Sequence, residues 1–113
     1  MAEKRAAMRK RIDQLAGQFL QRCSQDMVSA REAVARLRGG NATALQELEH
    51  LAHRICGTGA SLGFESLSAC ANATERFAEA QASSTLPDPQ ATERLVEHIE
   101  RLEKEIDRLE MAR

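Results

Sequence analysis

His53 and Gly57 are the two residues of this 113-residue chain whose types and spacing most clearly suggest chemistry. A neutral imidazole carries a nucleophilic lone pair on one ring nitrogen, and it is available when the ring is exposed. Glycine costs a helix about 1 kcal/mol relative to alanine, so Gly57 in a helical stretch calls for a reason. Because helical side chains lean toward the N-terminus, a larger residue at position 57 would cover position 53. The pair predicts an imidazole left open to an approaching partner.

The element that must position this histidine is predicted to be a helix over about residues 43–62. Its apolar positions recur in alternating steps of four and three, as in a single buried stripe: Leu48, Ala52, Ile55, Gly59 and Leu62. His53 lies roughly 160° from Ile55 on the helical wheel, so we expect its ring to face water. Gly59 falls on the stripe, where a missing side chain lets a neighbouring helix come close.

The remaining helices are predicted over about residues 3–38, 65–81 and 89–111. The first carries an apolar stripe that we expect to be buried: Met8, Ile12, Leu15, Phe19, Cys23, Met27, Ala30, Val34 and Leu37. Gly17 is the position where this helix would kink or break. In the third helix, Leu67, Cys70 or Ala71, Thr74 and Phe77 should point inward. The last helix repeats Leu95, Ile99, Leu102, Ile106 and Leu109.

Local signals mark the ends of these helices. Gly39-Gly40 supplies positions where a positive φ is cheap, and Gly63 is expected to end the histidine helix. The stretch Thr43-Ala44-Leu45-Gln46 has the spacing of a capping box. A loop is expected over 83–89, closing with Asp88 as N-cap and Pro89 as the first helical residue.

Short connections imply antiparallel neighbours, so the predicted fold class is all-α. The architecture is an antiparallel four-helix bundle with an additional N-terminal helical segment, forming a single domain over residues 1–113. The regular heptad of the last helix could also form a coiled-coil dimer, although a bundle helix needs the same stripe. We expect a monomer rather than a dimer.

Composition limits the possible partners and the compartment. The net charge of −1 comes from 16 basic and 17 acidic residues, which gives no reason to expect nucleic acid or a membrane as a partner. A basic N-terminal run, Lys4 to Arg11, has no apolar segment after it and is interpreted as a solvated helix face in a cytoplasmic protein. The three cysteines match no CxxC spacing and are expected to be free thiols, with Cys23 and Cys70 in the core and Cys56 near the surface.

The spacing of His53, Gly57 and Gly63, H-x3-G-x5-G, resembles that of histidine phosphotransfer (HPt) domains, and Leu51-Ala52, Thr58 and Leu62 fit the same pattern. The resemblance in helix order extends from about Leu15 to Glu110. It implies that His53 is phosphorylated on its outer ring nitrogen and passes the phosphoryl group to a receiver-domain aspartate. The implied partners are a response-regulator receiver domain, a histidine kinase, or both. The residues expected to face such a partner surround His53 on its helix: Gln46, Glu49, His50, Arg54, Cys56 and Gly57.

One departure from the HPt pattern concerns charge. The family usually has lysine three residues after the histidine, where it offsets the charge of the phosphoryl group, and this chain has Cys56. Arg54 is the nearest cation in sequence but points about 100° away from His53. Either its side chain reaches round, or the partner supplies the charge, or transfer is weak or absent. The alternative function is therefore an HPt-like adaptor that binds a receiver, or dimerises, without phosphotransfer.

The sequence also bears on two other kinds of chemistry, autophosphorylation and metal binding. The sequence lacks a GxxxxGK[ST] loop, so the chain should not phosphorylate itself from ATP, and no cofactor is expected. Glu47-x-x-His50 and His53-x-x-Cys56 place possible metal ligands on adjacent turns. Di-iron bundles use two inward-facing Glu-x-x-His pairs, whereas this chain has one and it faces outward, so no metal is expected.

Overall fold

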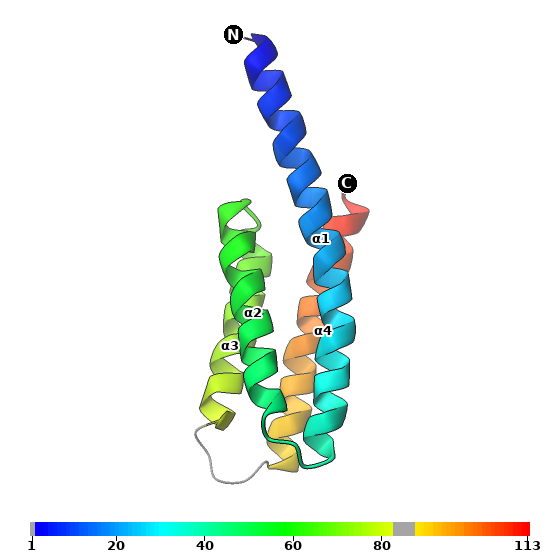
Figure 1. The fold of residues 1–113 in the computed structure, drawn as a ribbon, viewed down its shortest axis with the longest axis vertical. Helices are drawn as coiled ribbons and strands as arrows, with labels where there is room; N and C mark the ends of the chain where they lie inside the picture. The colour runs from blue at the N-terminus through cyan, green and yellow to red at the C-terminus, as the bar shows by residue number, and fades with distance from the viewer. Residues whose placement is uncertain (1, 83–87) are drawn as a thin grey trace.

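Four helices make up the computed structural model, which describes residues 2–82 and 88–113. They are α1 (Ala2–Arg38), α2 (Ala44–Ser61), α3 (Glu65–Ala82) and α4 (Pro89–Met111). Each helix packs against the next in chain order and α4 packs against α1, whereas the diagonal pairs stay further apart. Figure 1 shows α2 beside α3 and α1 beside α4. The described residues contain no strand, and the predicted all-α bundle is confirmed.

The four helices share one core of leucine, isoleucine and small residues. Its largest fully buried apolar side chains come from all four helices: Leu20, Leu48, Ile55, Leu67, Leu95, Leu102 and Ile106. The predicted stripes of α2 and α4 are buried, although Leu62 and Leu109 at their ends are only half-buried. In α3 the buried positions are Leu67, Ala71, Thr74 and Ala78, so Leu67 and Thr74 point inward as predicted, while Cys70 and Phe77 are half-buried beside the core. The expectation of a core position for Cys70 was therefore wrong.

The first helix is much longer than its neighbours and is unbroken at Gly17. Its 37 residues span about 55 Å at 1.5 Å per residue, close to the 58 Å longest dimension of the molecule. The first buried residue of α1 is Ala16, and in Figure 1 the preceding part extends past the ends of the other helices. Burial of Met8, Ile12 and Leu15 was predicted wrongly, because their exposures are 66%, 46% and 45%. The additional N-terminal helical segment is the free end of α1.

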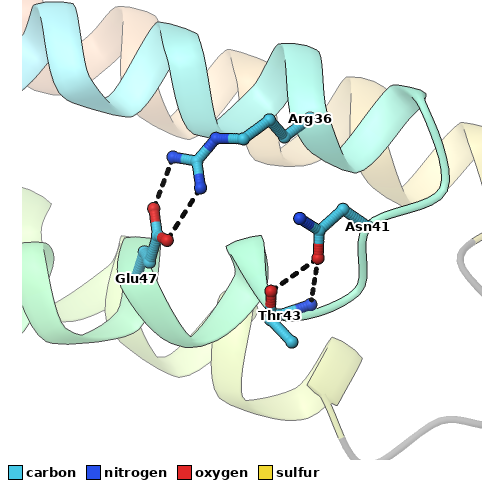
Figure 2. Close-up of polar contacts among 4 residues, drawn as sticks. All are labelled: Arg36, Asn41, Thr43 and Glu47. Atoms are coloured by element: carbon cyan, nitrogen blue, oxygen red, sulfur yellow. Dashed lines mark hydrogen bonds and ion pairs between the residues drawn. The ribbon is translucent and has the colours of Figure 1, made fainter.

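The turn between α1 and α2 is organised by Asn41 rather than by a capping box. The Asn41 side-chain oxygen accepts hydrogen bonds from the Thr43 backbone nitrogen at 3.1 Å and from the Thr43 hydroxyl at 2.5 Å (Figure 2). The Thr43 hydroxyl caps no backbone group of α2, contrary to the prediction, because Thr43 already has helical dihedral angles (φ −65°, ψ −20°) rather than those of an N-cap residue. Gly40 has a φ of +95°, the positive value that its position after α1 predicted.

The other two connections agree with the sequence where they are described. Gly63 follows α2 with a φ of +86°, and α3 begins two residues later. The Asp88 carboxylate accepts a hydrogen bond from the Gln90 backbone nitrogen at 3.0 Å, with Pro89 as the first helical residue. Most of the loop predicted over 83–89 lies outside the described residues. None of the helices in the described part of the chain is long and apolar enough to span a membrane.

Candidate functional site

His53 lies near the middle of α2 on its outer face, as the wheel predicted. Its side chain is 73% exposed, whereas Ala52 and Ile55 beside it are buried. One turn further on, a Cβ atom built at Gly57 would meet no atom within 4 Å. Neither a side chain at position 57 nor a neighbouring element covers the imidazole on this side.

A glutamate on the neighbouring helix holds one nitrogen of this ring. His53 Nδ1 lies 2.8 Å from Oε1 of Glu75 on α3, and the Glu75 side chain is only 19% exposed. An ionised carboxylate can only accept a hydrogen bond, so Nδ1 must carry the proton that joins the pair. In the neutral ring this leaves Nε2 unprotonated, with its lone pair directed away from Glu75.

Sequence reasoning missed Glu75, although a signal for it exists. The turn around Gly63 makes α2 and α3 antiparallel neighbours, and His53 and Glu75 are each eleven residues from Phe64. Residues at equal distances from a tight turn lie at the same height on the two helices. Pairing the helices in this way would have placed an acidic side chain beside the histidine.

A groove between α1 and α2 borders His53 on the side opposite α3. Its volume is about 910 Å³, and Leu15, Phe19 and Leu62 form an apolar part of its lining. His53 and Gly57 belong to the α2 wall of the same groove. A protein that reaches the imidazole therefore meets an apolar depression directly beside it.

Charged residues of both helices also line this groove. Arg54 Nη2 is 3.9 Å from Oδ1 of Asp26 on α1, and Arg22 also lines the groove. Burial raises the pKa of the Asp26 carboxyl, while Arg54 and Arg22 act in the opposite direction. Arg54 thus faces α1 and His53 faces α3, in agreement with their predicted separation around α2.

The other residues predicted to face a partner are arranged on both sides of His53. Gln46 and His50 are exposed, and Glu49 is half-buried. Cys56 is half-buried between α2 and α3, where its Sγ lies 3.4 Å from the Ser68 hydroxyl oxygen. That hydroxyl donates a hydrogen bond to the Cys56 carbonyl oxygen at 2.8 Å. Cys56 is therefore less accessible than expected, because it is half-buried like Cys70.

Gly59 faces the start of α3, but the approach of the two helices does not require a glycine there, contrary to the expectation. A Cβ atom at this position would lie 3.7 Å from both the Phe64 oxygen and the Ser68 nitrogen, which is ordinary van der Waals contact. Phe64 also stacks on Phe19 of α1, with ring centroids 6.0 Å apart. The glycine thus lies where α1, α2 and the start of α3 meet, and there is room for a methyl group but for little more.

Glu47, one of the four candidate metal ligands, is paired with an arginine instead. The Glu47 carboxylate receives two hydrogen bonds from the Arg36 guanidinium, at 2.7 and 2.5 Å (Figure 2). This pairing lowers the pKa of Glu47. Within residues 2–82 and 88–113, no three histidine, cysteine, aspartate or glutamate side chains are grouped closely enough to hold a metal ion. The geometry lends no support to the metal-site alternative.

Comparison with protein families places this geometry in context. The family model for the Hpt domain matches residues 14–112, nearly the whole chain. The chain belongs to the Hpt domain family. No curated protein and no solved structure matches it. Hpt domains interact with response regulators and kinases in phosphorelays, so the family assigns this chain to that class of signalling protein.

Proposed function

We propose that the protein relays a phosphoryl group between receiver aspartates, or from a histidine kinase to a receiver, through His53. The observation that carries the proposal is the hydrogen bond between His53 Nδ1 and Glu75, which leaves Nε2 as the free nucleophile on an uncovered face of α2. Membership of the Hpt family supports the same reaction class.

The first step is attack of the Nε2 lone pair on the phosphorus of an aspartyl phosphate. The N–P bond forms, the P–O bond to aspartate breaks, and the aspartate carboxylate leaves with the bonding electrons. The proton on Nδ1 stays in place, so the phosphorylated ring is cationic. Glu75 stabilises this imidazolium by its negative charge, as a carboxylate does when it orients a catalytic histidine.

The second step is the reverse reaction with another aspartate. When the acceptor carboxylate attacks phosphorus, the N–P bond breaks and the electrons return to Nε2. Because Nδ1 has kept its proton, the leaving group is a neutral imidazole rather than an imidazolate anion. Glu75 therefore favours transfer in both directions by holding one tautomer.

Charge neutralisation in this reaction must come largely from the partner. The position three residues after His53 holds Cys56, which is half-buried beside Ser68, and Arg54 is turned toward Asp26. Phosphoryl transfer depends on in-line positioning and on cations around the transferred group. We infer that a receiver domain brings the metal ion and the aspartate, and that this chain brings the oriented imidazole as a monomer.

The test is incubation of the protein with phosphorylated receiver domains, followed by analysis of the protein-bound phosphate. A phosphohistidine is labile in acid and stable in base. We expect label on the wild-type protein, loss of label in His53→Gln, and persistence of label in His98→Gln, which removes a histidine of α4, away from the site. No label on the wild-type protein with any of the source organism's receivers would favour the adaptor alternative.

A further inference from the structure

The free end of α1 carries an exposed apolar stripe. We call residues 2–15, which precede the first buried residue of the helix, the α1 overhang. Met8, Ile12 and Leu15 lie within about 60° of one another on the helical wheel, and all three are exposed. The family match begins at residue 14, so nearly all of the α1 overhang lies outside the part common to Hpt domains.

Basic residues lie beside this stripe and acidic residues lie on the opposite face of the helix. Lys4 and Arg11 flank it on one side, Arg5 and Arg9 flank it on the other, and all four lie within about 90° of its centre. Glu3 and Asp13 lie about 130–150° from the centre, on the opposite face of the helix. The face that carries the apolar stripe is thus bordered only by basic residues, although the chain as a whole has a net charge of −1.

The stripe continues into the groove beside His53. Leu15 belongs to both, because it is the last exposed apolar residue of the α1 overhang and also lines the groove with Phe19 and Leu62. The opposite wall of that groove contains His53. A partner seated on His53 therefore has a continuous apolar path onto the α1 overhang.

The position of the α1 overhang is set by the bundle. Nucleation is the costly step in forming a helix, and α1 is already nucleated by its packed part, so the overhang only extends it. At the base of the overhang, the Arg113 side chain donates a hydrogen bond to the Asp13 carbonyl oxygen. The exposed stripe is thus held in a fixed direction above the groove.

We propose that the α1 overhang is a second docking element for the protein that exchanges phosphate with His53. It binds a partner surface with an apolar centre and acidic borders. The inference rests on the proposed function, because the protein that presents an aspartate to His53 is the one whose surface reaches the α1 overhang, and the basic residues of the overhang call for acidic side chains on that surface. Four basic residues around the stripe attract such a surface over about the 8 Å Debye length of physiological salt.

Two other occupants fit the observations less well. A bilayer is flat and could not follow the stripe into the groove beside His53. A second copy of the chain that paired overhang to overhang would bring two basic borders together, which repels. A protein partner can both follow the apolar stripe into the groove and place acidic side chains beside its basic borders.

The experiment compares receiver binding by two double variants and one control. Met8→Ser/Ile12→Ser removes most of the stripe, and Arg5→Gln/Arg9→Gln removes one basic border. Lys10→Gln removes a positive charge from the opposite face of the same segment and is the control. The probes are the source organism's receiver domains, each activated with beryllofluoride, with Kd and the association rate measured at two salt concentrations.

We expect the stripe variant to weaken Kd for the best-binding receiver by about tenfold, roughly the effect of 1.4 kcal/mol. The border variant should slow association several-fold at low salt and reduce its salt dependence, whereas Lys10→Gln should bind like the wild-type protein. Because the stripe is solvent-exposed, the melting temperatures of all variants should stay near that of the wild-type protein, which circular dichroism checks.

The two proposals fail in different ways. A Kd unaffected by the stripe variant, together with label on His53, would overturn docking by the α1 overhang and leave phosphotransfer standing. Binding that depends on the α1 overhang without any label on His53 would overturn phosphotransfer alone. Binding of the wild-type protein to anionic phosphatidylglycerol vesicles but to no receiver, or a dimer that Met8→Ser/Ile12→Ser dissociates, would overturn the docking proposal in favour of those occupants. Reaction of His53 with phosphoramidate, which requires no partner, checks the imidazole separately in each variant.

Discussion

Glu75→Gln tests the chemical role assigned to the residue behind His53. The substitution keeps the size of the side chain but replaces an acceptor that carries a full negative charge with a neutral amide. The amide can accept from Nδ1 or donate to it, so the ring is no longer held in one tautomer. It also no longer offsets the positive charge of the phosphorylated imidazolium.

The size of the effect follows from the geometry. His53 Nδ1 and Glu75 Oε1 are 2.8 Å apart, which is the length of a charge-assisted hydrogen bond. The His53 side chain is 73% exposed, however, so water screens the interaction. Exposed ion pairs contribute about 0.2–1 kcal/mol, and the low exposure of Glu75, 19%, places this pair near the upper end. A loss of about 1 kcal/mol in the transition state corresponds to a rate about five-fold lower.

The assay is single-turnover transfer from a phosphorylated receiver in excess, with rates measured for transfer in both directions. Asp107→Asn serves as a control, because it removes one exposed carboxylate from α4, which is diagonal to α2. ¹⁵N chemical shifts of the His53 ring report the tautomer directly. If Glu75→Gln transfers at the wild-type rate and the ring still protonates only on Nδ1, the reasoning about Glu75 is refuted.

Four further predictions concern the site and the buried thiol of Cys23. Gly57→Ala and Gly57→Leu should each raise the free energy of unfolding by up to about 1 kcal/mol, since no atom lies close to a side chain at this position. Only the leucine should slow phosphoryl transfer, because it is large enough to cover the His53 ring. Equal transfer rates for the two variants would contradict this explanation of Gly57. Because the partner supplies the neutralising charge, Cys56→Lys should transfer at about the rate of Cys56→Met, and several-fold faster transfer by Cys56→Lys would contradict that inference. Burial raises the pKa of Cys23 to about 12, with Asp26 and Glu110 adding to the shift, so iodoacetamide should label it last of the three thiols, and early labelling of the folded protein would contradict this. For the same reason stability should decline as the pH rises from 9 toward 12, because the unfolded thiol loses its proton first, and alkaline thermal melts compared with those of Cys23→Ala measure this.

Helix periodicity was enough to predict the exposure of His53 and the burial of the stripe opposite it. Both follow from the angle between residues on a single helix, which does not depend on the rest of the fold. The cap at Asp88 was equally local, because an aspartate before Pro89 satisfies a free backbone nitrogen within the same turn. These features needed no knowledge of which helices are neighbours.

Features that depend on neighbouring elements were missed. Periodicity cannot say where the neighbours of a helix end, so Met8 and Ile12 were assigned to the core although α2 is only half as long as α1. The capping box at Thr43 failed because Asn41, two residues earlier, accepts from the Thr43 backbone nitrogen that the Gln46 side chain would have satisfied, and because Thr43 itself has helical dihedral angles. Glu75 was missed because its pairing with His53 depends on the register of two helices rather than on either one.

The unbroken course of α1 through Gly17 has a mechanical consequence. From Ala2 to Arg38 the helix is a single stiff rod, and the side of the groove that bears Phe19 is part of it. The N-terminal end of α1 is about 20 Å from Leu15, so the α1 overhang is a rigid arm that can pivot only where α1 enters the bundle. Because α1 has no kink, a force that tilts the α1 overhang also moves the α1 side of the groove, which lies opposite His53.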